Sequence, residues 1–243
     1  MLNDYLFLLP SFSAGLALSM VCALLGTFLV INRFSLLGDG IAHLSFSSIA
    51  LALVLGLPPL YLAIPLALLA SLGIDYLEKS KSLGGDASIG ILSSGGMALG
   101  LILISVYQSS SLSIQNYLFG NILLINSAEM WITILWSLIV SSLIIYFHSP
   151  LLIISLNSDL AHTNGYKTSF WRIFLLFISS VSIVLSIKLV GVILASALFI
   201  LPISIAIQYR KNFQKTRILS LISGFSMIIS GFLLSILLNW PTG

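Results

Sequence analysis

An aspartate and a histidine, Asp39 and His43, stand four residues apart inside a long apolar stretch of the sequence. Residues at positions i and i+4 share one face of an α-helix, so this carboxylate and imidazole would be neighbours. If a helix ran unbroken from Arg33 at the membrane surface, Asp39 would lie about 9 Å and His43 about 15 Å deeper. A carboxylate within a bilayer costs on the order of 2.5–3.5 kcal/mol or more, so a partner must offset that cost.

Either another protein group or a visiting cation could offset the cost of this acid. Carboxylate oxygen and imidazole nitrogen together suit a divalent transition metal such as zinc, manganese or iron. One pair cannot complete a coordination shell, so further ligands would come from facing helices, from water, or from Ser45 and Ser47 nearby. Two structural alternatives stay open at this point: an Asp39–His43 hydrogen bond, and capping of the helix N-terminus by Asp39.

The sequence around this pair is that of an integral membrane protein. Hydrophobic residues make up 58% of the 243 residues and charged residues only 7%, against about 25% charged in soluble domains. Eight apolar segments approach the roughly 20 residues that cross a bilayer core, and their continuous hydrophobicity favours helices over barrel strands. We predict an all-α, polytopic membrane helical bundle of about eight transmembrane helices, forming a single transmembrane domain over residues 1–243. The segments are Tyr5–Ile31, Leu36–Gly56, Leu60–Leu77, Ala87–Tyr107, Met130–Phe147, Phe170–Leu189, Gly191–Gln208 and Ile218–Leu238.

Lysine and arginine residues predict how this bundle is oriented. With the N-terminus outside and one crossing per segment, nine of the ten basic residues fall on the inside, and only Lys188 lies near the outer surface. The positive-inside rule therefore favours an N-out, C-out topology. The stretch 108–121, polar but uncharged, is then an outer connection. The inside residues are Arg33, Lys79, Lys81, Lys167, Arg172, Arg210, Lys211, Lys215 and Arg217.

The remaining acids and the glycines predict local features only. Asp75, Glu78 and Asp86 flank an inner loop that carries Lys79 and Lys81, and we expect these three acids to face solvent. Gly96 and Gly100 are one helical turn apart, a spacing that lets helices approach closely.

The sequence lacks the short motifs of several enzyme classes. It has no H-E-x-x-H metalloprotease motif, no G-x-S-x-G nucleophile elbow and no phosphate-binding loop. The nearest candidate, "NGYKT" around Lys167, has neither the glycine pattern nor the G-K-[ST] order. If a nucleotide drives transport, another subunit must bind it.

Five blocks of the sequence together resemble the membrane permeases of ABC importers for zinc, manganese or iron(II). "GDGIAHLSFSSIALAL" is similar to the family block that carries an aspartate and a histidine, with serine at the position where glycine is common. The others are "SIGILSSGGMALGLILIS", "IQNYLFGNIL", "LNSDLAHTNGYKT" and "LVGVILASALFILPISIA". The end "LNWPTG" is similar to a family segment that one more hydrophobic helix usually follows. Because the sequence stops at Gly243, we expect either a truncation or the absence of that final helix.

This resemblance implies a function for the opening pair and for one inner loop. Asp39 and His43 match the acid and histidine expected to line the translocation path. The loop with Asp159, Gly165 and Lys167 would hold the coupling helix that docks into an ATPase. The resemblance further implies a homodimer in a bacterial plasma membrane, two cytoplasmic ATP-binding subunits and an extracytoplasmic metal-binding protein. The metal would be the substrate of alternating-access transport, with no permanently bound cofactor and no enzymatic activity in this chain.

Two alternatives stay open, another type of ABC importer and a transporter of a different class. A permease for metal chelates would need a wide path with few ionisable ligands, which the Asp39–His43 pair disfavours. An ion-coupled secondary carrier would need no ATPase and would show inverted repeats with broken helices, which the sequence does not show. The ligand types do not separate zinc from manganese or iron.

Overall fold

A computed structural model describes residues 9–79, 85–107 and 127–238, and every regular element in these ranges is an α-helix. The helices are α2 (Leu9–Ile31), α3 (Leu37–Leu55), α4 (Pro59–Lys79), α5 (Gly85–Tyr107), α7 (Ser127–Tyr146), α8 (His148–Leu156), α9 (Ser158–Thr163), α10 (Thr168–Val190), α11 (Val192–Gln208) and α12 (Phe213–Leu238). Several predicted features lie outside the described residues: the start of the first segment at Tyr5, Lys81, the outer stretch 108–121, the block 114–123 and residues 239–243.

Eight apolar helices among the described residues correspond to the eight segments predicted from hydropathy. In the described ranges, seven helices are long and apolar enough to cross a membrane. The remaining one, α11, is a shorter apolar helix that follows α10 directly after a break at Gly191, whose φ of 86° suits glycine. The all-α membrane bundle is therefore confirmed, while the orientation of its two ends stays a prediction.

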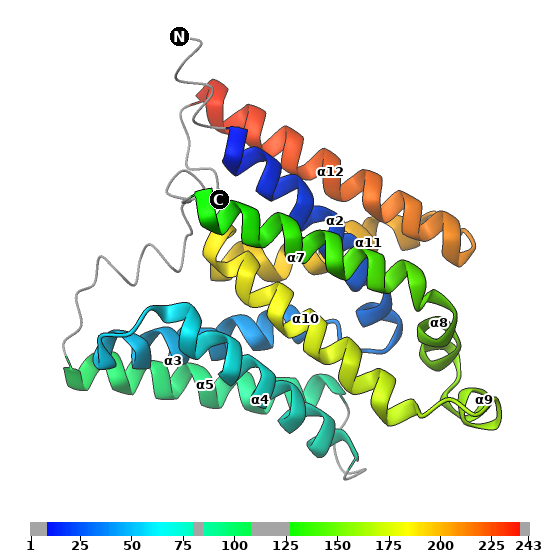
Figure 1. Ribbon diagram of the computed structural model, residues 1–243, viewed down its shortest axis with the longest axis horizontal. Helices are drawn as coiled ribbons and strands as arrows, with labels where there is room; N and C mark the ends of the chain where they lie inside the picture. The colour runs from blue at the N-terminus through cyan, green and yellow to red at the C-terminus, as the bar shows by residue number, and fades with distance from the viewer. Residues whose placement is uncertain (1–8, 80–84, 108–126, 239–243) are drawn as a thin grey trace.

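The long helices form two groups joined by α10 (Figure 1). In one group α3 packs against α4 and α5, and in the other α2 packs against α7, α11 and α12. Helix α10 contacts members of both groups, and α11 contacts both α2 and α3. Burial follows this arrangement, because about 72% of the span residues of α2 and α10 are buried against only 17% in α5 and 11% in α12. Helices α2, α3 and α10 thus form the core, and α5 and α12 lie at the periphery.

Glycines set the closest helix contacts. A Cβ added to Gly96 would lie 2.7 Å from a methyl carbon of Leu44, and one added to Gly100 would lie 2.7 Å from the ring of Phe46. Both contacts join α5 to α3, as the spacing of the two glycines predicted. The tightest approach is that of α2 to α11, where a Cβ on Gly26 would stand 2.2 Å from the backbone oxygen of Phe199.

Asp75 and Glu78 do not face solvent freely, so that prediction was wrong. Asp75 is only 5% exposed, and its Oδ1 lies 2.7 Å from Nη2 of Arg172 on α10. The Arg172 Nη1 also lies 3.5 Å from Oε1 of Glu78. A buried carboxylate is tolerated when it is paired in this way. Asp86, by contrast, is exposed as expected.

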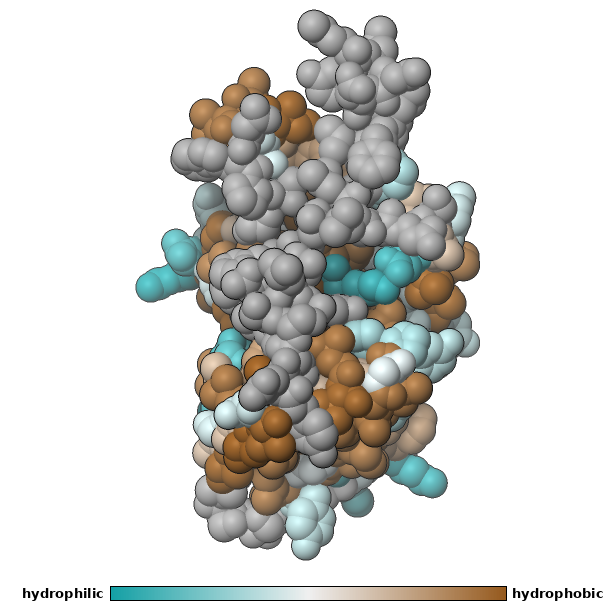
Figure 2. Space-filling model, turned by 90° about the vertical axis from the view of Figure 1, so that its left-hand side faces the viewer, coloured by the Kyte–Doolittle hydropathy of each residue, from teal (hydrophilic) through white to brown (hydrophobic). Residues whose placement is uncertain are grey.

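The surface agrees with a membrane-embedded bundle. Among the described residues that Figure 2 shows, hydrophobic residues predominate, and hydrophilic residues occur in a few separate places. Lys188, for which the sequence predicted no partner, forms an ion pair: its ammonium on α10 donates to the Glu129 carboxylate on α7. This pair joins the two helices at the end opposite to α8 and α9.

Candidate functional site

Helix α3 presents Asp39 and His43 on one accessible face. The Asp39 side chain is 52% exposed and that of His43 is 31% exposed, and the two are separated by 3.5 Å between Oδ1 and Nε2. This distance is longer than a direct hydrogen bond of about 2.7–3.2 Å. The carboxylate and the imidazole are therefore close enough to act on one ion and remain open to it.

Two glycines shape the surroundings of Asp39. A Cβ on Gly38 would lie 3.1 Å from the Cα of Ser196 on α11, and a Cβ on Gly40 would lie 2.3 Å from a methyl carbon of Ile89 on α5. Helices α11 and α5 therefore approach α3 on the two sides of Asp39. Because Asp39 lies between these glycines in the helical rotation, its face of α3 is the one these two neighbours leave accessible.

The beginning of α3 differs from the sequence-based expectation. The chain turns after α2, with Phe34 N–H donating to Leu29 O and Leu37 N–H donating to Phe34 O, and α3 begins at Leu37. The depths predicted from an unbroken helix at Arg33 therefore do not apply. Asp39 is not the helix cap, because Leu36 holds that position. It lies in the first turn, where the helix dipole favours a negative charge.

The site has an incomplete set of metal ligands within one chain. Among the described residues, no group of three or more His, Cys, Asp or Glu side chains is gathered in one place. Ser45 is buried and its hydroxyl donates to Ile41 O, while the hydroxyl of Ser47, on the Asp39 face, donates to Leu44 O. One carboxylate and one imidazole per chain thus leave positions for water or for another molecule.

The loop that we predict to lie inside and to couple to an ATPase contains a short helix, α9. The Asn157 side chain begins it, because its Oδ1 accepts the N–H groups of Asp159 and Leu160 at 2.9 and 3.1 Å. Gly165 ends the turn with a φ of 80°, in the left-handed region that glycine adopts without strain. Asp159 and Lys167 are both exposed.

Sequence analysis missed two features around α9. Leu156 and Leu160 are 68% and 58% exposed, so apolar side chains project from this segment beside its charges. The signal was present in the pattern "SLNSDLAHT", where two leucines four residues apart stand among polar residues, but such a short pattern does not reveal which side is buried.

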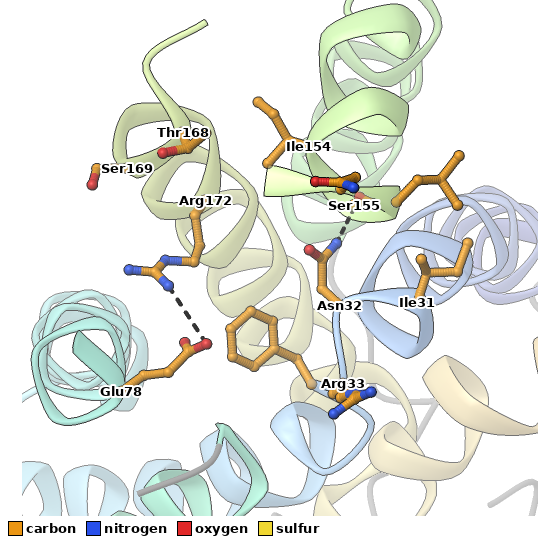
Figure 3. Close-up of a pocket in the computed structure, with 12 residues that line it drawn as sticks. Ile31, Asn32, Arg33, Glu78, Ile154, Ser155, Thr168, Ser169 and Arg172 are labelled. Atoms are coloured by element: carbon orange, nitrogen blue, oxygen red, sulfur yellow. Dashed lines mark hydrogen bonds and ion pairs between the residues drawn. The ribbon is translucent and has the colours of Figure 1, made fainter. Parts of the chain in front are cut away.

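The second missed feature is a polar cavity of about 550 Å³ beside the same segment. Its walls come from the α2–α3 turn, the end of α4, the end of α8 and the start of α10. Figure 3 shows two polar bridges on opposite sides of it: Arg172 reaches toward Glu78, and the Asn32 side chain reaches Ser155. No sequence pattern indicated this cavity, because its walls come from four separate parts of the chain.

Comparison with known proteins defines the class of this helical bundle. The sequence profile of the ABC 3 transport family matches residues 4–243, and the chain belongs to this family. It is a multi-pass permease subunit of an ABC importer in the bacterial plasma membrane, and ATP hydrolysis belongs to a separate subunit. The sequence resemblance is thereby confirmed.

Named relatives and a solved structure extend over nearly the whole chain. The chain is 33% identical over its full length to the manganese import system permease protein ScaB of Streptococcus gordonii, covering 87% of that protein. It is 27% identical, over 97% of its length and 90% of the relative, to the high-affinity zinc uptake system membrane protein ZnuB of Haemophilus influenzae. The solved structure of PsaBC from Streptococcus pneumoniae in complex with Fab matches with a TM-score of 0.84 and 30% identity, covering 100% of this chain and 90% of that one.

Proposed function

We propose that this permease imports a divalent transition metal ion, manganese or zinc, and that Asp39 and His43 contact the ion on its path. The observation that carries the proposal is the pair itself: an acid and an imidazole 3.5 Å apart, both accessible, on a core helix of a membrane bundle. Relatives that carry manganese and zinc in their names support the same substrate class. Both ions accept oxygen and nitrogen ligands.

We further propose that two copies of the chain form the path. One chain supplies one oxygen and one nitrogen donor, so a second Asp39–His43 pair facing the first would give two carboxylates and two imidazoles. Four donors satisfy the common coordination of zinc and leave water positions for manganese. The pair must hold the ion only briefly, because a site that binds too tightly does not conduct.

The segment around α9 has the features of a docking surface for an ATPase. Exposed Asp159, Leu160 and Lys167 offer mixed charged and apolar contacts, and Gly165 fixes the turn that leads into α10. We propose that a cytoplasmic ATP-binding subunit docks here and that an extracytoplasmic metal-binding protein delivers the ion at the opposite end. ATP binding would then drive alternating access through the movement of α9.

The other candidate functions are less well supported. Membership of the ABC 3 transport family is at odds with an ion-coupled secondary carrier. A path for metal chelates would gain nothing from an accessible carboxylate and imidazole in close contact, because the chelator already fills the coordination shell of the metal.

The test uses isosteric substitutions in cells that depend on this importer. We expect Asp39→Asn and His43→Gln each to lower uptake of radiolabelled manganese or zinc by about tenfold or more, because each removes a charged or nitrogen ligand. Asp86→Asn is the matched control, since Asp86 is an exposed acid in the first turn of α5. Uptake at the wild-type rate in both site variants, with equal amounts of protein in the membrane, would contradict the proposed role.

A further inference from the structure

The polar cavity beside α9 lies apart from the Asp39–His43 pair and has no role in the function proposed so far. Two of its walls are the end of α8 and the start of α10, the elements that flank α9 in the chain. Its other walls are the α2–α3 turn and the end of α4. At about 550 Å³, the cavity has the size of sites that bind small molecules or inserted side chains.

Most polar groups that line the cavity already have partners. The Asn32 amide donates to Ser155 at 2.7 Å, and the Ser155 hydroxyl donates to Leu151 O. The Asn157 side chain caps α9, and Arg172 pairs with the acids of α4. These contacts fix the walls but leave little capacity for a ligand.

Three lining side chains are left without a hydrogen bond or ion pair to any of the described residues: Arg33, Thr168 and Ser169. Arg33 carries a permanent positive charge, and the two hydroxyls can each donate a hydrogen bond. No lining carboxylate is available in the same way, because Glu78 is paired with Arg172. The free groups therefore suit a negatively charged, acceptor-rich ligand such as a carboxylate.

Arg33 also holds a backbone conformation that its side chain disfavours. Its φ of 61° places it in the left-handed region, at the position after α2 where glycine is the usual residue. Such a conformation costs a non-glycine residue about 1 kcal/mol. A glycine would relieve this strain, whereas arginine keeps a side chain whose one polar group is the guanidinium, which points to a role for the charge itself.

The walls of the cavity favour a protein ligand over a lipid. The Arg172–Glu78 and Asn32–Ser155 bridges join α10 to α4 and α8 to α2 at the level of the cavity (Figure 3). Lipid tails would have to pass between these joined helices, past a lining that is largely polar. The exposed Leu156, which lines the cavity, instead continues into the apolar surface of α9.

We propose that this cavity is a second docking site for the ATPase subunit and receives an acidic side chain that pairs with Arg33. Thr168 and Ser169 add hydroxyl donors on the wall of the cavity that α10 supplies. The inference rests on the proposed docking of the ATPase at α9 and adds a contact beneath it. An acid held between the end of α8 and the start of α10 would resist the separation of these two helices. The ATPase would then contact the α9 segment on two sides.

The test measures binding of the cognate ATPase to the full-length permease in nanodiscs of neutral lipid, at several salt concentrations. We expect Arg33→Gly to weaken binding about tenfold or more, because a charged hydrogen bond is lost, and to reduce its salt dependence. Arg210→Gly is the matched control. Arg210 is likewise an exposed arginine with a positive φ, 47°, at the end of α11, and it does not line the cavity. Both glycines relieve strain, so neither variant should lose folded protein.

A second variant fills the cavity instead of removing the charge. Ser169→Trp should weaken ATPase binding as Arg33→Gly does, because Ser169 is an exposed lining residue and the indole would occupy the space. Wild-type affinity and salt dependence in Arg33→Gly would overturn this inference while leaving docking at α9 intact. In parallel nanodiscs that contain phosphatidylglycerol, loss of bound phosphatidylglycerol in Arg33→Gly with unchanged ATPase binding would also overturn it, in favour of a lipid site. A wild-type permease that binds no ATPase would overturn the proposed function together with this inference.

Discussion

At the residue scale, exposure explains how a membrane helix can carry the Asp39–His43 pair. An acid sealed among apolar side chains would be expensive to ionise, but half of the Asp39 side chain is open. Its charge can therefore be hydrated or can meet a passing cation. The 3.5 Å separation from His43 is short enough for attraction and too long for a strong hydrogen bond that would compete with a metal.

His148, outside the spans at the start of α8, gives a prediction about pH. Burial lowers the pKa of His148 from its usual 6.5, and the nearby Arg217 cation lowers that pKa further. In the unfolded chain the pKa returns to about 6.5, so the unfolded state takes up this proton first as the pH falls. The folded state is then penalised progressively below pH 6.5, until the folded-state pKa is passed.

We therefore expect acidification from pH 7.5 to 5.5 to lower the melting temperature of the wild type more than that of His148→Gln. His162→Gln is the control, because His162 is exposed on α9 and should behave like the wild type. The measurement is thermal unfolding in detergent at each pH. Equal losses in the wild type and His148→Gln would refute the assignment to His148.

At the element scale, the packing of α2 against α11 depends on a single glycine. A Cβ at position 26 would meet the backbone oxygen of Phe199 at 2.2 Å, and a backbone atom cannot rotate away as a side chain can. We expect Gly26→Ala to force the helices apart and to destabilise the protein by about 1–3 kcal/mol or more.

Gly231 on α12 provides the matched control, because a Cβ there would meet nothing within 4 Å. Gly231→Ala should be neutral or stabilising by about 0.5–1 kcal/mol, since alanine is the better helix former. Thermal unfolding of both variants in the same detergent checks the difference. Equal melting temperatures would mean that α2 and α11 can separate without cost.

The elements that could be predicted from the sequence are those that do not depend on packing against distant parts of the chain. Hydropathy located all eight apolar helices, because each is a long continuous run that needs no information about its neighbours. The ends of the helices were harder to predict. Helix α3 begins at Leu37, after a turn in which Arg33 takes the place of the usual glycine. The buried position of Asp75 was missed because its partner, Arg172, lies on a distant part of the chain.

The candidate site was predictable for a similar reason. Asp39 and His43 are four residues apart on one helix, so spacing alone placed them together. Gly38 and Gly40, where α11 and α5 come close to α3, could be seen in the sequence. Their neighbours Ser196 and Ile89 could be known only from the fold. The polar cavity depends on four separate segments and was out of reach.

At the scale of the whole molecule, α10 links the α9 segment to the face of α3 that carries Asp39 and His43. It begins directly after the α9 turn, is joined to α4 through Arg172 and packs against α3. A displacement of α9 can therefore reach α3 through rigid, buried helices. The proposed docking of an ATPase at α9 requires α9 to lie on the cytoplasmic side.

Thr163, exposed at the end of α9, tests that orientation. We expect a cysteine at this position, in a Cys22→Ser background, to resist membrane-impermeant thiol reagents in intact cells. It should react once the inner face is exposed, because positive residues around it favour the cytoplasmic side. Labelling of intact cells would invert the topology and remove the proposed ATPase contact.

Gly165 tests whether the turn after α9 transmits movement. Its φ of 80° is closed to proline, which is fixed near −65° and has no N–H to replace the bond from Gly165 to His162 O. Gly165→Pro should therefore misalign α9 with α10 and lower the number of metal ions imported per ATP hydrolysed. Gly56→Pro is the matched control. Gly56 has a φ of 67° and also donates a backbone hydrogen bond, but it lies at the C-terminal end of α3, away from α9. We expect both variants to lose similar thermal stability and only Gly165→Pro to uncouple, as measured in proteoliposomes containing the complete transporter. The same transport ratio in both variants would mean that the α9 turn supports the fold and does not couple ATP hydrolysis to transport.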